Sequence, residues 1–269
     1  MQAANRLQQA LKSGKASFGG WQGLPGSNVS RVIARTPNLD WVCIDCEHGN
    51  ISDDGMHEAV AAVAACGVSP IVRVPEGQHW MIKRALDAGA HGIIVPLLQT
   101  AEDAKNIAKY SKFPPAGNRG LGSALSMEKF ISGKTGDVKE VSMADYYSNA
   151  NTSTVICVQI ETASALEQVK DIAAVEGIDV LFIGPTDLGN SIGHPSVLSG
   201  GKMAPELEEA IETIRKAAKD AGKSSGIYMG TGEQAKKYAD MGFNMVNAAN
   251  DIAVLKKYFG DHIAAATAS

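Results

Sequence analysis

Residues 41–49 read Trp-Val-Cys-Ile-Asp-Cys-Glu-His-Gly. The first four are apolar, which is typical of a buried strand, and the run then ends abruptly in charged side chains and a glycine. Asp45, Glu47 and His48 place three ionisable groups within four residues, and such groups are costly to bury unless they are paired or bind a metal. This stretch therefore predicts a buried strand that delivers charged side chains to a functional site.

Similar apolar runs recur along the chain, and most are followed by a helical pattern. The predicted strands are Ala16–Trp21, Trp41–Asp45, Pro70–Val74, Gly92–Val95, Thr154–Ile160, Val180–Ile183, Ser225–Met229 and Phe243–Val246. The predicted helices are an amphipathic N-terminal helix, Ser27–Thr36, Asp53–Cys66, Trp80–Ala88, Thr100–Lys112, Ala163–Ala173, Pro205–Ala221 and one after each of the last two strands. Two long loops are expected, at 113–150 and 184–203.

Repeated strand–helix units indicate a parallel sheet, and their number and the chain length favour a closed (β/α)₈ TIM barrel, the α/β class, over an open doubly wound sheet.

Composition is typical of a globular protein with a large core. Of 269 residues, 45% are hydrophobic and 20% are charged, and 25 basic against 29 acidic residues give a net charge of −4. No dense basic cluster indicates nucleic acid, and no apolar run of about 18 residues indicates a membrane span. No linker of low complexity divides the chain, so we expect one domain over residues 1–269.

The N-terminus and the cysteines bear on location. Residues 1–7 lack the apolar core of a secretory signal, and four cysteines fit a reducing, cytoplasmic compartment. Cys43 and Cys46 have the Cys-x-x-Cys spacing, but side chains three apart on a strand point to opposite faces. We therefore expect free thiols rather than a zinc or redox site.

Charged and polar side chains gather at the ends of four predicted strands, whereas the strand bodies are apolar. Active sites of TIM barrels lie at the carboxyl ends of the strands. The residues that this rule collects are Asp45, Glu47 and His48 from the second strand, Arg73 from the third, Gln159 and Glu161 from the fifth, and Gly184, Thr186 and Asp187 after the sixth.

Each of these residue types has a chemical use. Glu161 and Asp187 are candidate ligands for a hard divalent cation such as Mg²⁺ or Mn²⁺, although either could instead cap the helix that follows it. His48 is the candidate general base, because an imidazole exchanges a proton near neutral pH. Arg73 could hold a developing oxyanion, or form a salt bridge inside the barrel mouth.

Asp87 ends a predicted helix, where a carboxylate opposes the helix dipole, so a cationic or imidazole partner is expected. The remaining histidines, His57, His79, His91, His194 and His262, are expected at the surface or in loops. The glycine-rich run 115–123 lacks the spacing of a phosphate-binding loop, and we expect it to shape the mouth of the active site.

The predicted strand bodies contain no lysine. A Schiff-base aldolase on this fold requires a lysine inside the barrel, so a metal-dependent route to an enolate is the natural alternative.

Five motifs together resemble the HpcH/HpaI aldolase family, the class II 4-hydroxy-2-oxoheptanedioate and 2-keto-3-deoxy sugar acid aldolases related to the citrate lyase β subunit. The motifs occur in the family's order, and the resemblance covers about residues 14–259. They are residues 44–48 (Ile-Asp-Cys-Glu-His), 72–75 (Val-Arg-Val-Pro), 114–120 (Pro-Pro-Ala-Gly-Asn-Arg-Gly), 158–162 (Val-Gln-Ile-Glu-Thr) and 182–188 (Phe-Ile-Gly-Pro-Thr-Asp-Leu).

The resemblance implies a divalent-metal-dependent aldolase that cleaves a 4-hydroxy-2-oxo acid to pyruvate and an aldehyde. It implies that Glu161 and Asp187 bind the metal (Mg²⁺, or Mn²⁺ or Co²⁺) and that Gln159 and the backbone of Gly184 and Thr186 help to hold pyruvate. It further implies that Arg73 stabilises the enolate and that His48 transfers the proton. Asp45 or Asp87 would raise the basicity of His48. Asp45 and Glu47 are expected to orient the imidazole and a metal-bound water.

The resemblance also implies assembly into trimers or hexamers, often with the last helix packed on a neighbouring subunit.

Two residues depart from the family pattern, in which Cys46 is usually glycine and Thr186 usually alanine. The end of the last strand, residues 247–251, is also more polar than the family version. These changes bear on the choice of aldehyde. Two other functions stay open, namely metal-dependent decarboxylation of oxaloacetate (or another carbon–carbon lyase reaction through the pyruvate enolate) and a non-catalytic barrel.

Overall fold

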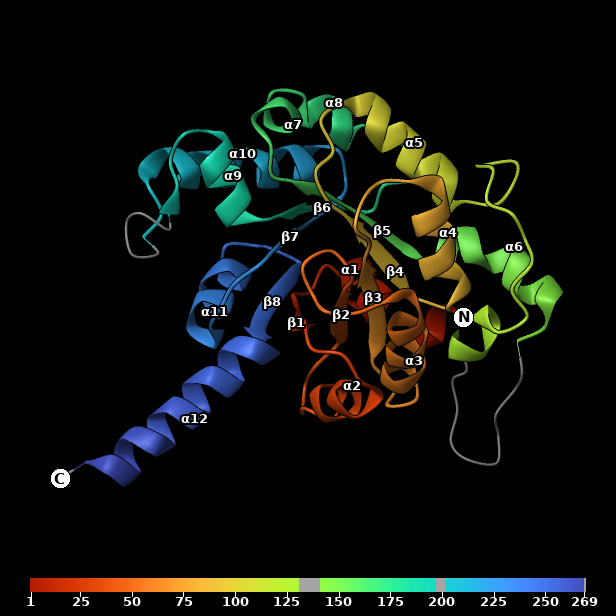
Figure 1. Ribbon diagram of the computed structural model, residues 1–269. Helices are drawn as coiled ribbons and strands as arrows, with labels where there is room; N and C mark the ends of the chain where they lie inside the picture. Colours follow the sequence, from red (N-terminus) through yellow and green to blue (C-terminus); the bar gives the residue numbers. More distant parts are fainter. Residues whose placement is uncertain (131–140, 197–201, 269) are drawn as a thin grey trace.

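The computed structural model describes residues 1–130, 141–196 and 202–268. Its centre is a closed barrel of parallel strands that follow one another in chain order, with β8 pairing back onto β1 (Figure 1). The strands are β1 Ser17–Gln22, β2 Trp41–Asp45, β3 Ser69–Arg73, β4 Gly92–Val95, β5 Val155–Ile160, β6 Val180–Ile183, β7 Ser224–Ile227 and β8 Met245–Asn250. The predicted (β/α)₈ barrel is confirmed.

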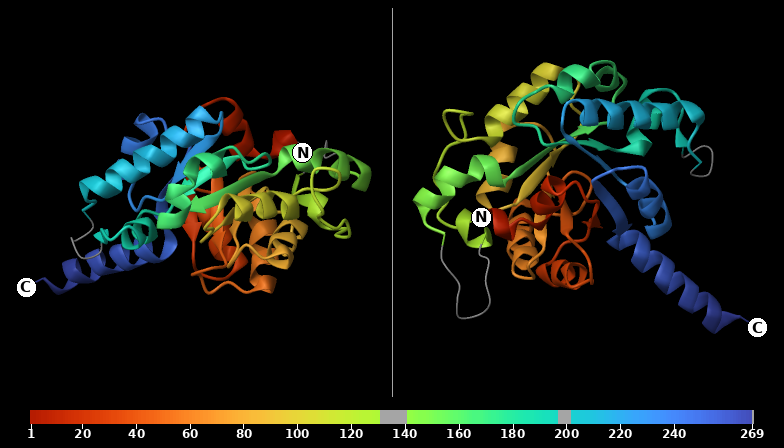
Figure 2. Two further views of the ribbon diagram at one scale, coloured as in Figure 1. Left: turned by 90° about the horizontal axis from the view of Figure 1, so that it is seen from above. Right: turned by 180° about the vertical axis from the view of Figure 1, so that it is seen from behind.

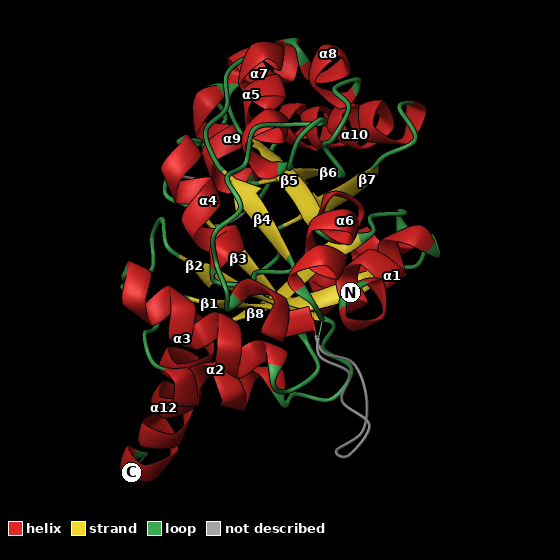
Figure 3. Cartoon of the chain, turned by 90° about the vertical axis from the view of Figure 1, so that its right-hand side faces the viewer, coloured by secondary structure: helices red, strands yellow, loops and turns green. Residues whose placement is uncertain are grey.

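Helices surround the barrel and connect its strands (Figures 1 and 3). The α-helices are α1 Arg6–Lys12, α2 Ser27–Ala34, α3 Asp53–Ala64, α4 His79–Asp87, α5 Ala101–Ser111, α6 Met143–Ser153, α7 Ala163–Glu167, α8 Val169–Ala173, α9 Pro185–Ser191, α10 Pro205–Asp220, α11 Gly232–Asp240 and α12 Asp251–Thr267. Two short 3₁₀ helices, η1 Gln2–Ala4 and η2 Ser126–Phe130, complete the described secondary structure.

The strand period of two places the site residues inside the barrel. In β2, Trp41 and Cys43 pack in the interior cluster, whereas Val42 and Ile44 pack outward against the helices. Asp45 shares the inward parity of Trp41 and Cys43. Cys46 packs against the outer layer and both cysteines are free thiols, so the predicted opposite orientation of the Cys43 and Cys46 side chains is confirmed.

Large side chains fill the barrel interior. The indole of Trp41 is fully buried there, and a Cβ on Gly19 of β1 would fall 2.2 Å from that ring. Glycine at this position therefore lets β1 pass beside the indole. Leu7 of α1 belongs to the same interior cluster, so the N-terminal helix closes the end of the barrel opposite the strand carboxyl ends.

Three segments differ from the prediction. Helix α6 lies in what was expected to be a loop, as does α9. The helix expected over residues 163–173 is two helices, α7 and α8, which meet at Gln168. Strand β8 extends to Asn250, four residues beyond the predicted Val246, because the polar run 247–250 continues the ladder with β1.

His91 lies in the connection before β4, as the loop alternative predicted, but its side chain is buried rather than at the surface. It directly precedes β4, where its ring contacts the Ser69 hydroxyl and the Lys129 carbonyl oxygen and stacks on Phe130. Burial lowers the pKa of His91 to about 4. Asn5 reaches the same region and donates to the carbonyl oxygen of His91.

Helix α12 leaves the barrel as a projecting arm (Figures 1 and 2). The structure describes every residue of this helix, and none of them is buried. Tyr258, Phe259 and Ile263 are each exposed over more than 60% of their surface. Within the described residues, no helix is both long and apolar enough to cross a bilayer.

Candidate active site

A cavity of about 380 Å³ opens at the carboxyl ends of the strands. This volume lies in the range of small-molecule sites. The residues that line it are Trp21, Asp45, His48, Arg73, Gln159, Phe182, Gly184, Pro185, Thr186, Asp187, Tyr228 and Asn250. Six of the predicted site residues outside the metal pair, together with Asp187, therefore meet at one place.

Asp45 is the centre of a hydrogen-bond network. Its carboxylate accepts from Arg73 Nε at 2.9 Å and Nη2 at 2.6 Å, and from the indole N–H of Trp21 at 3.0 Å. The backbone N–H groups of Glu47 and His48 donate to it as well, each at 3.1 Å. Burial disfavours the charged form of Asp45, but the hydrogen bonds and charge of Arg73 outweigh burial and lower the pKa of this carboxyl. Asp45 therefore stays ionised and orients Arg73.

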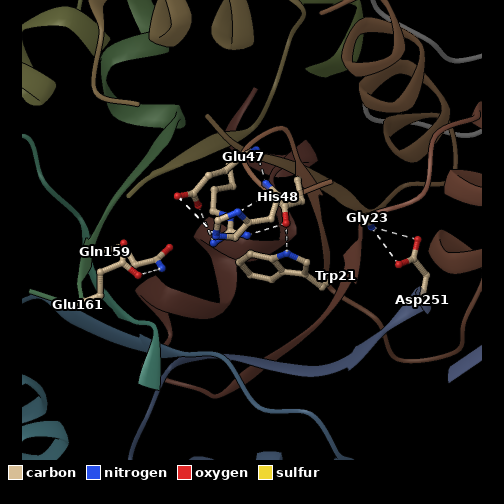
Figure 4. A network of polar contacts seen from close by, with 9 residues as sticks. Trp21, Gly23, Glu47, His48, Gln159, Glu161 and Asp251 are labelled. Carbon is tan, nitrogen blue, oxygen red and sulfur yellow. Dashed lines mark hydrogen bonds and ion pairs between the residues drawn. The ribbon is translucent and has the colours of Figure 1, made fainter. Parts of the chain in front are cut away.

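Glu47 connects Arg73 to His48 (Figure 4). Its Oε2 lies 2.8 Å from Arg73 Nη1, and its Oε1 lies 3.8 Å from Nε2 of His48. Burial raises the pKa of Glu47 in spite of the nearby Arg73 and His48. Asp45 meets His48 through the backbone, so of these two carboxylates it is Glu47 that faces the imidazole.

The His48 ring is open to solvent, with 67% of its side chain exposed, whereas Arg73 is buried. An exposed imidazole can exchange a proton with a substrate while a fixed guanidinium in the same cavity holds negative charge.

Glu161 is buried beside Gln159 and Gly184 (Figure 4). Its Oε1 accepts the backbone N–H of Leu97 at 2.8 Å, and its Oε2 accepts from the Gln159 amide. Leu97 has a φ of 58°, in the left-handed region, and this unusual conformation aims its N–H at the carboxylate. A Cβ at Gly184 would fall 2.6 Å from Glu161 Oε2, so glycine leaves room for that side chain.

The alternative that Glu161 caps a helix does not hold. Thr162 is the N-cap of α7, and its hydroxyl accepts from Ala165. Asp187 lies in the first turn of α9, whose N-cap is Gly184, and it also lines the cavity. Thr186 is exposed at the cavity edge.

The residues present fit a divalent cation. Burial, together with the nearby carboxylates of Asp187 and Glu47, outweighs the hydrogen bonds from Leu97 and Gln159 and raises the pKa of Glu161 to about 7. Gln159 Oε1 is buried and has no hydrogen-bond partner among the described residues. Two carboxylates and a free amide oxygen form a hard donor set. Within the described ranges, no group of three His, Cys, Asp or Glu side chains could hold a metal ion by itself.

Asp87 does not line this cavity. It ends α4, before β4 begins, and pairs with Arg119 Nη2 at 3.0 Å. The expected cationic partner is therefore present, and the predicted influence of Asp87 on His48 stays a prediction.

Arg119 belongs to the glycine-rich run 115–123, no residue of which lines the cavity, so the expectation that this run shapes the mouth of this site was wrong.

Sequence reasoning missed four lining residues, because it searched for charge at strand ends. Trp21 lies near the end of β1, Phe182 in β6, Tyr228 after β7 and Asn250 at the end of β8. The same strand-end rule, extended to aromatic and amide side chains, would have collected Trp21, Tyr228 and Asn250.

The chain is similar to several known proteins over nearly its whole length. A curated hydroxypyruvate/pyruvate aldolase of Roseovarius nubinhibens is 32% identical over 93% of this chain and 92% of its own length. A 4-hydroxy-2-oxo-heptane-1,7-dioate aldolase of Klebsiella pneumoniae is 34% identical over 94% of this chain and 90% of its own. The crystal structure of an HpcH/HpaI aldolase from Desulfitobacterium hafniense superposes with a TM-score of 0.86 at 28% identity, covering 98% of this chain and 97% of that one. The family model described as HpcH/HpaI aldolase/citrate lyase matches residues 24–257, and the chain therefore belongs to this family of carbon–carbon lyases.

Proposed function

We propose that this enzyme is a divalent-metal-dependent aldolase that cleaves a 4-hydroxy-2-oxo acid to pyruvate and an aldehyde. The observation that carries the proposal is the convergence of His48, Arg73, Gln159 and Asp187 on one cavity with the buried Glu161 beside it. The names of the relatives support the pyruvate half of the reaction.

Glu161 and Asp187 would hold the cation, with Mg²⁺ favoured over Mn²⁺ or Co²⁺ because the donors are oxygens. When bound, the cation would act as a Lewis acid that polarises the 2-oxo group of the substrate. Gln159, Gly184 and Thr186 would contact the pyruvate carboxylate and oxo group.

His48 would take the proton of the C4 hydroxyl as the C3–C4 bond breaks. The aldehyde leaves, and the electron pair of that bond forms the pyruvate enolate. Arg73 has five N–H groups, of which three point at Asp45 and Glu47. The remaining two can donate to the enolate oxygen, until C3 takes up a proton and pyruvate is released.

A coupled assay for pyruvate tests the proposal. The magnesium-loaded enzyme should release pyruvate from 4-hydroxy-2-oxo acids, should lose this activity in EDTA and should regain it with added Mg²⁺. Oxaloacetate is the comparison substrate, because its decarboxylation passes through the same enolate without a C4 hydroxyl. Full activity in EDTA would contradict the metal mechanism, and activity on oxaloacetate alone would favour a decarboxylase.

We further propose that the enzyme is a homo-oligomer, a trimer or hexamer, assembled through α12. An apolar groove of about 500 Å³ lies between α2 and α12, and Val32 on its α2 side is 74% exposed. Exposed apolar surface of this extent on a projecting helix is typical of a protein–protein interface.

The continuous barrel over residues 17–250 supports one catalytic domain. The free thiols among the described residues fit the reducing cytoplasm as its location.

A further inference from the structure

Leu97 has a backbone conformation that its residue type does not explain. Among the described residues, Asn38 and Leu97 are the non-glycine residues with a positive φ, at 64° and 58°. Asparagine tolerates this left-handed region, because its short side chain can bond to the local backbone, whereas leucine has no such compensation for the steric cost. A conformation of this kind persists only where the surrounding structure imposes it, and such residues cluster at functional sites.

Burial of the Leu97 side chain does not account for this conformation. The side chain is 51% exposed and lies at the wall of an outer cavity of about 550 Å³ between α4 and α5. Its neighbours Pro96 and Leu98 are both buried, so Leu97 is the residue of this loop that turns outward. The reason for its φ must therefore lie in the backbone rather than in the packing of the side chain.

Two hydrogen bonds fasten the loop between β4 and α5 to the segment that follows β5. The hydroxyl of Thr162 donates to the carbonyl oxygen of Leu98 at 3.1 Å, and the hydroxyl of Ser164 donates to that of Gln99 at 2.9 Å. Both carbonyl groups directly follow Leu97 in the chain. The loop is therefore fixed against the same segment that carries the candidate cation ligand.

The N–H group of Leu97 fixes how the Glu161 carboxylate is turned. It donates to Oε1 at 2.8 Å, while the Gln159 amide donates to Oε2. The terminal torsion of a glutamate is broad, so its own rotamer preference does not set the plane of the carboxylate. With Oε1 held by Leu97, Oε2 lies beside Gln159 and Gly184, and both of these residues line the active-site cavity.

We propose that Leu97 is a positioning residue of the cation site, and that its left-handed conformation sets the affinity for the cation by holding the Glu161 carboxylate. This inference rests on the proposed function, in which Glu161 and Asp187 bind the cation. Leu97 acts through its backbone, so a side chain that tolerates the left-handed region should replace it, and one that does not should weaken the site. Groups that orient metal ligands from behind typically contribute about ten- to a hundredfold in metal affinity.

The test measures Mn²⁺ binding by calorimetry, together with the melting temperature of the metal-free protein. Leu97→Val introduces a β-branched side chain, which strongly disfavours the left-handed region, and it should weaken Mn²⁺ binding about tenfold. Leu97→Asn should bind Mn²⁺ within about twofold of the wild type, because asparagine adopts this conformation readily. The exposed position means that neither change removes much packing.

Asn38→Val is the matched control. Asn38 has nearly the same φ, is exposed and precedes β2, at the end of the barrel opposite the cavity. The substitution therefore introduces the same backbone conflict away from the cation site. It should lower the melting temperature as Leu97→Val does, but its Mn²⁺ affinity should be that of the wild type.

Ser164→Ala is a second, independent variant that loosens the same loop. It removes the hydrogen bond to the Gln99 carbonyl oxygen and leaves Leu97 and Glu161 in place. Mn²⁺ binding should weaken about threefold, since one partly exposed hydrogen bond is lost. If Leu97→Val does not fold, this variant decides, and wild-type affinity in it would overturn the inference.

Two further results would overturn the inference while leaving the proposed function intact. One is wild-type Mn²⁺ affinity in a folded Leu97→Val protein, because the conformation would then serve the loop alone. The other is an equal loss in Leu97→Val and Leu97→Asn, which would assign the effect to the leucine side chain. A wild type that binds no Mn²⁺ would instead contradict the cation site itself, and the inference with it.

Discussion

At the scale of single residues, the ionisable groups of the site are of two kinds. Some are fixed by hydrogen bonds inside the barrel, and one, the His48 imidazole, is open to solvent. Asp45 accepts five hydrogen bonds and is fixed as an anion beside Arg73, so it orients rather than transfers protons. His48 is exposed and has its ring 3.8 Å from Glu47. The sequence predicted both residues from their position at the end of an apolar run, and it also predicted that Glu47 orients the ring; the coordinates add that Asp45 meets His48 only through the backbone.

His48→Ala should lower aldol turnover by about 10²- to 10⁴-fold, because a positioned general base contributes that much. Binding of Mn²⁺, measured by calorimetry, should change little, since Glu161 and Asp187 are intact. His79→Ala, on the outer helix α4, is the matched control. Loss of Mn²⁺ binding in His48→Ala would contradict this division of roles.

Gly184→Ala should weaken Mn²⁺ binding at least tenfold, because the new Cβ would lie 2.6 Å from Glu161 Oε2 and 2.7 Å from Gln159 Nε2 and would displace both side chains. Gly232→Ala is the control, since a Cβ there meets no atom within 4 Å. Calorimetry on the two variants measures the difference, and equal affinities would show that Glu161 does not bind the cation.

The fold and the site were predictable from the sequence to different extents. Charged strand ends identified Asp45, Arg73 and Glu161, because a charge beside an apolar run is conspicuous. Tyr228 and Asn250 escaped that search, since neither residue type is unusual at the surface. The edge-to-face contact between Tyr228 and Trp21 joins residues far apart in the chain and became visible only in the structure.

At the scale of elements, strand–helix alternation was sufficient to predict the barrel, and the errors have local causes. The segment of α6, residues 143–153, is rich in Asn, Ser and Thr, which favour turns, so its helix was missed. Strand β8 carries amide side chains, and it extends as a strand because β1 supplies hydrogen-bond partners. Tertiary pairing therefore sets the length of β8, whereas α6 begins at a local cap, in which the Ser142 hydroxyl accepts the backbone N–H of Asp145.

The free energy of unfolding should depend on pH through His91, which is buried at the amino end of the barrel. Its pKa of about 4 is below the ordinary value near 6.5, so as pH falls the unfolded chain takes up a proton before the folded one. The ring faces Ser69, the Lys129 carbonyl oxygen and the N-terminal ammonium, which also lowers its pKa. The free energy of unfolding should therefore keep its maximum value above about pH 6.5 and decrease by up to about 3 kcal/mol as the pH falls towards 4.

Urea unfolding at pH 7, 5.5 and 4.5 measures this loss. His91→Gln is the comparison variant, because its amide can still donate to the Lys129 carbonyl oxygen but does not titrate. It should be less stable than the wild type at pH 7 and show a flatter dependence on pH. Parallel curves for the two proteins would exclude His91 as the cause.

At the scale of the whole molecule, α12 stands apart from the barrel that it follows (Figure 2). No other described segment packs over the exposed apolar side chains of α12, and the groove between α2 and α12 continues that apolar surface. A second copy of the chain would bury both.

Light scattering should find the wild type as a trimer or hexamer, and Phe259→Glu should shift it to smaller species. Phe259 is 64% exposed in the single chain, so a charge there is tolerated unless a partner covers it. Lys256→Ala, on the same helix, should leave the assembly unchanged. A monomeric wild type would contradict assembly through α12.

At the same scale, we propose that Glu161 and Asp187 hold a cation that promotes formation of the pyruvate enolate. Exchange of the pyruvate methyl protons with D₂O, followed by NMR without any aldehyde, measures enolate formation alone. Exchange is expected with Mg²⁺, none is expected in EDTA, and Glu161→Gln should lose at least a hundredfold in exchange rate, whereas Glu167→Gln on α7 should behave as the wild type. Exchange at the full rate in EDTA or in Glu161→Gln would contradict this proposal.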